Sequence, residues 1–173
     1  AQERARAGQK YEDILAFYYK DTALYTVGTY DTAPRIKAEG CTFQSCGISG
    51  IKPGTTTEKL LGKLQSDGAL SIIDKKGAKK EGTLCTGDSV RNTYDNGLAI
   101  FDLPIVIYGD VDGNGKIDKD DITALQKHLI RSSILGGPYL IAADVNHDET
   151  VDIMDMIRLI QYVSDDAKIT QED

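Results

Sequence analysis

The chain has 173 residues and a mass of 18.8 kDa, which suits one ordinary domain or two small ones. Its net charge of -7 disfavours a nucleic-acid partner, and no stretch approaches the roughly 18 apolar residues of a membrane span. The acidic excess lies in residues 109–173, which carry 14 acidic against 6 basic residues, 12 of the acids being Asp. Cation coordination would explain so many Asp residues, and a solvated acidic tail is the alternative.

The first segment, residues 1–26, is predicted to be helical, because Tyr11, Ile14, Leu15 and Tyr18 form an apolar stripe at helical period. With the sequence GQKYEDIL at residues 8–15, it resembles the end of the catalytic domain of the stage II sporulation protein D family. Those proteins are lytic transglycosylases of the cell wall. The family's catalytic acid lies upstream of this motif, so the resemblance implies no catalytic residue in this chain. The alternative, which we prefer, is a remnant helix that packs on the next segment of the chain.

The second segment, residues 27–108, is predicted to be mostly β-structure. An apolar run at Ala69–Ile73 ends in a turn signal at residues 74–77, and residues 83–85 form another short run. Residues 103–108 are β-branched and predict a final strand, in which Pro104 indicates an edge or a strand start.

One helix is predicted within this segment, since Thr55 and Glu58 form a capping-box pattern ahead of Leu60, Leu61 and Leu64. The sequences GIKPGTT at 50–56, CTGDSV at 85–90 and VIYG at 106–109 resemble a small module of clostridial secreted proteins. For it we predict a β-sandwich with a spacer role, ligand binding being the alternative. The three cysteines, none in a CxxC spacing, allow at most one disulfide and predict no zinc site; packing is their expected role. They are Cys41, Cys46 and Cys85.

The third segment, residues 109–173, holds an internal repeat. A twelve-residue loop at 110–121 recurs at 144–155, 34 residues later, and each copy precedes an amphipathic stretch. An EF-hand loop supplies oxygen ligands from positions 1, 3, 5, 7, 9 and 12 and carries Gly at position 6. In the first copy these positions are Asp110, Asp112, Asn114, the backbone carbonyl of Lys116, Asp118 and Asp121. In the second they are Asp144, Asn146, Asp148, the carbonyl of Thr150, Asp152 and Asp155.

This double spacing predicts two Ca²⁺ ions, because a merely solvated acidic surface would not repeat Asp at positions 1, 9 and 12. Position 12 is Asp in both copies, and neither loop follows a long helix, so a free-standing calcium sensor is disfavoured. The second copy has Glu149 in place of Gly at position 6, which predicts a weaker or distorted site.

Residues 109–163 resemble a dockerin, on the first loop, the connector LGGPYL at 135–140 and the sequence AADVN at 142–146. The resemblance implies an extracellular, monomeric module that binds a cohesin on a scaffoldin of a polysaccharide-degrading complex, of cellulosome or amylosome type. It also implies a partner surface on the exposed residues of the two loop helices. These residues are Lys119, Asp120, Thr123, Gln126 and Lys127 in the first copy and Ile153, Met154, Ile157, Ile160 and Gln161 in the second.

The helix of the second copy has two apolar faces. Met156, Leu159 and Val163 form a core stripe, whereas the set at 153, 157 and 160 forms a second one. The second face is predicted to bind the partner, and the alternative is that it packs on the rest of the chain.

The predicted fold is α+β, with two modules. A small β-sandwich-like module with an N-terminal helix (residues 1–26 and 27–108) precedes an all-α dockerin (109–173) with two calcium loop–helix repeats. The predicted function is a non-catalytic, cohesin-binding adaptor. The alternative is the C-terminal part of a peptidoglycan lytic transglycosylase-like protein whose catalytic residues lie upstream.

Overall fold

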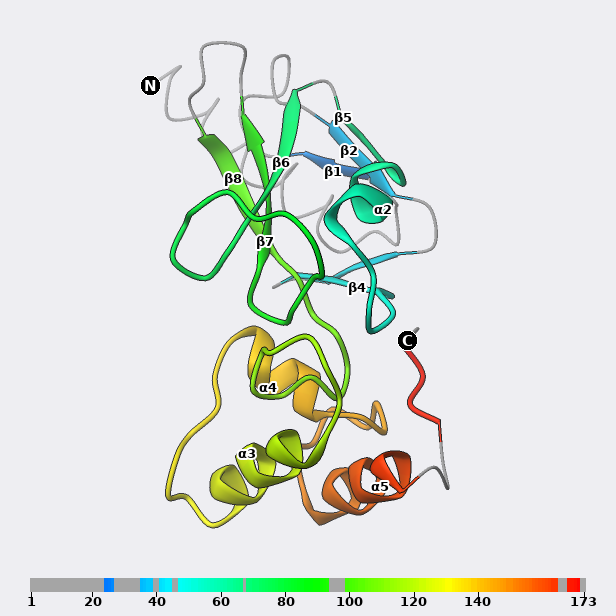
Figure 1. Cartoon of the computed structure of the whole chain (residues 1–173), viewed down its shortest axis with the longest axis vertical. Coiled ribbons are helices and arrows are strands. Elements are labelled where there is room, and N and C mark those ends of the chain that lie inside the picture. The colour runs from blue at the N-terminus through cyan, green and yellow to red at the C-terminus, as the bar shows by residue number, and fades with distance from the viewer. Residues whose placement is uncertain are drawn as a thin grey trace, which may run out of the picture.

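The computed structural model describes residues 24–26, 35–38, 41–44, 47–66, 68–93, 99–164 and 168–171. Its strands lie at one end of the molecule, and the helices α3, α4 and α5 lie together at the other (Figure 1). The chain is therefore α+β, as predicted. Of the predicted N-terminal helix, residues 1–23 lie outside the described residues. Residues 24–26 form a strand, so that part of the prediction was wrong.

The strands form three small antiparallel sheets in the described residues, in the orders β1-β2-β5, β3-β4 and β6-β7-β8. The structure shows three small sheets and not two large facing ones, so it does not establish the predicted β-sandwich, which stays a prediction. The strands are β1 (Leu24–Thr26), β2 (Arg35–Ala38), β3 (Thr42–Gln44), β4 (Gly47–Ser49), β5 (Leu64–Ser66), β6 (Ala69–Ile73), β7 (Ser89–Thr93) and β8 (Ala99–Pro104).

Of three expected β-features, the structure confirms one strand, lacks another and shifts the third. The strand at Ala69–Ile73 is confirmed, and the turn after it is closed by a hydrogen bond from Gly77 N–H to the Asp74 carbonyl. Residues 83–85 form no strand, since only Thr83 bridges, to Thr56. The final strand β8 ends at Pro104, so the prediction of a strand over 103–108 was right for residues 103 and 104 and wrong for the rest. Pro104 closes an edge strand, where its missing N–H costs no ladder bond.

The helix of this module, α2 (Thr57–Leu61), is capped by Thr56 and not by the predicted Thr55. The Thr56 side chain accepts from Lys59 N–H, whereas the Thr55 hydroxyl donates to the Lys52 carbonyl. Leu60 is buried as expected, but Leu64 reaches the same core from β5. Cys41 and Cys85 are free thiols, and Cys41 packs against this core, while Cys46 lies outside the described residues.

The helical end contains α3 (Lys119–Leu129), α4 (Pro138–Ala143) and α5 (Ile153–Val163). α3 packs against α5, and the buried Leu125 and Leu159 fill the space between them. The apolar residues Ile122, Leu125 and Leu129 of α3 and Met156 and Leu159 of α5 therefore face one core. None of the helices in the described part of the chain has the length and apolar character needed to cross a membrane.

The segment 105–108, which joins the two ends of the molecule, belongs to both hydrophobic cores. Ile105 and Ile107 lie in the core under the sheets, whereas Val106 and Tyr108 lie in the core of the helices. This alternation is the period of an extended chain, with successive side chains on opposite sides. The predicted boundary at residues 108 and 109 therefore cuts through shared packing.

Candidate metal centre

The first loop, residues 110–121, leads directly into α3, and the start of that helix fixes two of its acidic residues. Asp118 is the N-cap and accepts from Asp120 N–H at 2.9 Å, while Asp121 accepts from Asp118 N–H at 2.8 Å. This reciprocal capping box satisfies backbone donors that a helix start leaves free. The same bonds orient the side chains at loop positions 9 and 12.

Three carboxylates of this loop converge. One oxygen from each of Asp110, Asp112 and Asp121 lies within 4.8 Å of the others. Asp110 and Asp121 are fully buried, and no Lys or Arg among the described residues forms an ion pair with them. A buried carboxylate without a cationic partner is costly, so this donor set fits a hard cation such as Ca²⁺.

Burial also dominates the acid–base behaviour of these groups. It raises the pKa of Asp121 to about 7, against the opposing effect of backbone N–H groups from Asp118 and Asp112. Burial likewise raises the pKa of Asp110. At neutral pH the Asp121 carboxyl of the metal-free loop is therefore partly protonated, and a divalent cation would displace that proton.

The second loop, residues 144–155, repeats the hydrogen bonds of the first almost bond for bond. Asp155 accepts from Asn146 N–H at 3.2 Å and from Asp152 N–H at 2.9 Å, as Asp121 does from the corresponding amides. Asp144 accepts from Asp148 and Glu149 N–H, as Asp110 does from positions 5 and 6 of its loop. Sequence repetition has thus produced a repeated three-dimensional loop.

Two differences separate the copies. Positions 3 and 5 are Asp and Asn in the first loop but Asn146 and Asp148 in the second, and in each copy the amide donates to the carboxylate. Positions 4 and 6 have positive φ in both, but the second loop places His147 (φ 61°) and Glu149 (φ 67°) there instead of Gly. The unfavourable backbone expected at Glu149 is present, and His147 adds a second such position. The weaker calcium binding of this loop stays a prediction.

The family model of the dockerin type I domain matches residues 108–164. The resemblance inferred from residues 109–163 is thereby confirmed for this segment. Comparison with curated proteins and with solved structures gave no match. Dockerin domains bind calcium, in agreement with the acidic group of the first loop.

The individual ligand roles in the dockerin segment stay predictions, although the structure places each residue. Asp110, Asp112 and Asp121 form the acidic group, and Asn114 donates to Asp112 at 2.9 Å. The backbone N–H of Lys116 binds the Asn114 side chain. In the second loop, Thr150 N–H binds Asp148 and the Asp152 side chain caps α5. Position 3 of this loop is Asn146, so its carboxylates come from positions 1, 5, 9 and 12.

The predicted partner residues lie on the surface of the dockerin segment. On α5 the exposed fractions are 51% for Ile153, 55% for Met154, 42% for Ile157 and 41% for Ile160. The second apolar face of α5 is therefore largely exposed beside the described residues, which argues against the internal-packing alternative for this part of the chain. The remaining members of the set are at least partly exposed: Lys119, Asp120, Thr123, Gln126, Lys127 and Gln161.

Sequence reasoning missed two residues that hold the first loop and its start in place. Thr86, in a turn of the β-module, donates its backbone N–H to Asp110 at 2.7 Å. Gln171 binds both backbone groups of Tyr108, just before the first loop. No local sequence signal marks either contact, because the partners lie 24 and 63 residues apart in the chain.

Proposed function

We propose that the dockerin segment binds a cohesin module in a calcium-dependent manner and so tethers this chain to a scaffolding protein. The observation that carries the proposal is the dockerin match over residues 108–164, since dockerin domains bind cohesins. The two loops, with their matching hydrogen bonds, support a requirement for two calcium ions. The chain is then a monomeric, non-catalytic adaptor of an extracellular polysaccharide-degrading complex, of cellulosome or amylosome type.

The apolar face of α5 is the best candidate for the centre of the interface. Ile153, Met154, Ile157 and Ile160 are all more than two-fifths exposed, while Leu159 on the opposite side is fully buried. Exposed apolar sets at helical spacing are typical of helix-mediated recognition.

The corresponding positions of α3, 34 residues earlier, are all polar: Lys119, Asp120, Thr123 and Gln126. The two faces are therefore not interchangeable, and we propose a single binding orientation.

The first experiment is a binding assay of the intact chain against a panel of cohesins, with calcium and with an excess of chelator. We expect at least one cohesin to bind with calcium and to be released by the chelator. Binding that survives chelation would contradict the calcium requirement. Absence of binding across the panel would contradict the adaptor function. No release of fragments from peptidoglycan is expected, in line with a non-catalytic role.

The second experiment locates the interface. Ile153→Asp or Met154→Asp should weaken cohesin binding by roughly 30-fold, equivalent to about 2 kcal/mol, because a buried apolar anchor is lost. The fold should survive, since both side chains are already about half exposed.

Lys119→Ala and Asp120→Ala are the matched controls in α3 and should have smaller effects, mainly on the association rate. If variants of either copy bind normally and only the combined variant fails, the two faces are interchangeable and the single orientation is wrong.

A further inference from the structure

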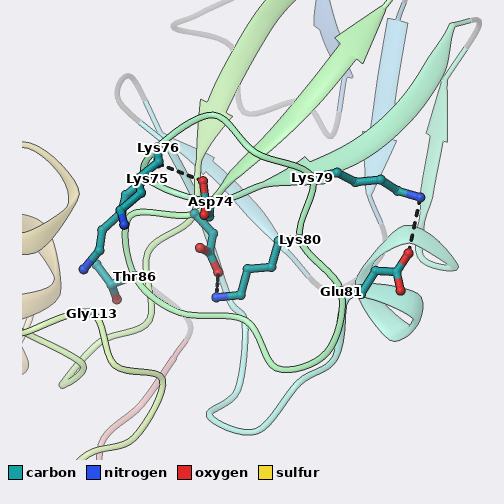
Figure 2. Close-up of a pocket in the computed structure, with 9 residues that line it drawn as sticks. Asp74, Lys75, Lys76, Lys79, Lys80, Glu81, Thr86 and Gly113 are labelled. Carbon is teal, nitrogen blue, oxygen red and sulfur yellow. Dashed lines mark hydrogen bonds and ion pairs between the residues drawn. The ribbon is translucent and has the colours of Figure 1, made fainter.

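A turn of the β-module, residues 85–88, is held rigidly from within that module. Asp88 N–H donates to the Cys85 carbonyl at 3.2 Å, and Gly87 has a φ of 91°, as the third position of a type II turn requires. The buried Asp88 carboxylate accepts from Cys85 N–H at 2.8 Å and from the Lys80 ammonium at 2.6 Å. Lys80 and Thr86 are among the residues that line a pocket of about 440 Å³ beside this turn. Figure 2 shows both side chains.

The turn is pressed against the first calcium-type loop. A Cβ atom at Gly113 would lie 2.6 Å from the Thr86 carbonyl oxygen, and one at Gly115 would lie 2.9 Å from the Leu84 carbonyl oxygen. Such separations are too short for any side chain larger than hydrogen. Glycine at loop positions 4 and 6 therefore serves the contact between the modules as well as the positive φ of the loop.

The contact delivers one hydrogen bond into the metal centre itself. Thr86 N–H donates to Oδ2 of Asp110 at 2.7 Å, and both residues are almost completely buried. The Thr86 hydroxyl fixes the same alignment, since it bonds to both the N–H and the carbonyl of Ile107. The other Asp110 oxygen accepts amides of its own loop, from Asn114 and Gly115.

The second loop lacks this feature in the part of the chain that the structure describes. Among the described residues, Asp144 at the corresponding position 1 accepts from Asp148 and Glu149 of its own loop alone. The two loops thus share their internal hydrogen bonds but differ in whether the position-1 carboxylate is held from outside.

We propose that the turn 85–88 is an outer part of the first calcium site, with the Thr86 N–H as the positioning group that orients Asp110. Partners of metal ligands commonly alter metal affinity by about 10- to 100-fold. By thermodynamic reciprocity, calcium at the first loop stabilises the turn as much as the turn favours calcium. The β-module is then a contributor to calcium binding and not a passive spacer. This inference rests on the calcium binding of the proposed function.

The test compares two variants that differ in one hydrogen-bond donor. Thr86→Ala loses the hydroxyl and keeps the N–H, whereas Thr86→Pro loses both. Proline suits the second position of a type II turn, so the turn itself is retained. Each loop is followed separately in a calcium titration of the intact chain, through the amide signals of Gly115 and Glu149. We expect Thr86→Pro to weaken the first loop about 10-fold or more relative to Thr86→Ala, with the second loop unchanged.

A second pair of variants leaves Thr86 itself intact. Lys80→Met removes the ion pair under the turn, whereas Lys79→Met removes an equal charge from an exposed pair with Glu81. The first change should weaken calcium binding at the first loop several-fold more than the second. In the unmodified chain, calcium should also slow hydrogen exchange of the Thr86 amide. This measurement decides the case if Thr86→Pro fails to fold.

Equal affinities for Thr86→Pro and Thr86→Ala, or a Thr86 amide that exchanges equally fast with and without calcium, would overturn the proposal while leaving calcium binding intact. A chain in which neither loop binds calcium would overturn both this inference and the calcium requirement of the proposed function. The two failures are therefore distinguishable.

Discussion

The backbone of Tyr108 is bound at both ends by the side chain of Gln171. The Tyr108 N–H donates to Oε1 at 2.9 Å, and the Tyr108 carbonyl accepts from Nε2 at 2.8 Å. Gln171 is buried, and nearby Ile169 lies in the same core as Tyr108. The tail segment 168–171 thus fastens the start of the dockerin segment, at the point where the first loop begins.

Gln171→Ala should therefore destabilise the calcium-loaded chain by about 2–4 kcal/mol, because a buried donor and a buried acceptor both lose their partner. Denaturant unfolding in saturating calcium measures the change. Gln161→Ala, at an exposed position of α5, is the matched control and should change stability by less than about 0.5 kcal/mol. Equal stability of the two variants would mean that the Gln171 bonds contribute nothing net.

Glu149→Gly should strengthen the second loop. Glu149 adopts a φ of 67°, which a residue with a Cβ reaches at a cost of roughly 1 kcal/mol, whereas its N–H bond to Asp144 survives the change. Part of this gain is offset by the greater freedom of glycine in the unfolded chain, so we expect a net gain of about 0.5 kcal/mol in unfolding free energy. Denaturant unfolding of the intact chain measures it.

Glu149→Ala removes the same carboxylate but keeps the Cβ, and it should gain little. If both variants gain equally, the charge of Glu149 and not its backbone is responsible.

Calcium binding at the first loop should weaken as the pH falls below about 7. Asp121 has a pKa of about 7 in the metal-free loop, above its ordinary value of 3.8, because it is buried. Its ionisation therefore costs the metal-free fold stability, which is lost as the pH rises from about 4 to about 7. Calcium needs the ionised form and displaces the proton.

Calorimetric titrations at pH 6 in buffers of different ionisation enthalpy should report about one proton released for each ion bound at this loop. At pH 8.5 the release should approach zero. A proton count that does not change between these two values would show that Asp121 is already ionised in the metal-free chain.

Arg131→Gly should stabilise the end of α3. Arg131 has a φ of 58°, and the hydrogen bonds from Arg131 N–H to His128 and from Ser132 N–H to Lys127 form a Schellman motif around it. Glycine is the preferred residue at this left-handed position, so we expect a gain of roughly 0.5–1 kcal/mol in unfolding free energy. Arg131→Ala retains the strain and should give no comparable gain. Thermal denaturation of the two variants and of the unmodified chain measures the difference.

The loops could be predicted residue by residue because their information is local. Positions 1 to 12 are set by spacing alone, whereas the capping role of Asp118 and Asp152 emerged only from the structure. The exposure of Ile153 and Ile157 could be anticipated only as one of two alternatives, because a helix with two apolar faces does not reveal which of them is covered.

The misplaced elements of the β-module have a tertiary cause. Residues 103–108 have strand propensity, but from Ile105 onwards the chain leaves its sheet. Its side chains then pack alternately into the two cores, and Val106 N–H donates to the Ile48 carbonyl. Thr86 and Gln171 act through contacts that span 24 and 63 residues, which no spacing rule contains. Long-range backbone contacts of this kind can be found only in three dimensions.

The segment 105–108 has a mechanical consequence. If a partner holds α5 while the preceding chain is pulled, the tension passes through this short extended stretch. The stretch is bonded sideways at Ile105 N–H to the Asp88 carbonyl (2.7 Å) and at Val106 N–H to the Ile48 carbonyl (2.9 Å). Both bonds run sideways from the extended chain, as inter-strand bonds do in a sheet. These two bonds, together with the side chains packed into both cores, are the contacts that tension along the segment would have to break before it could extend.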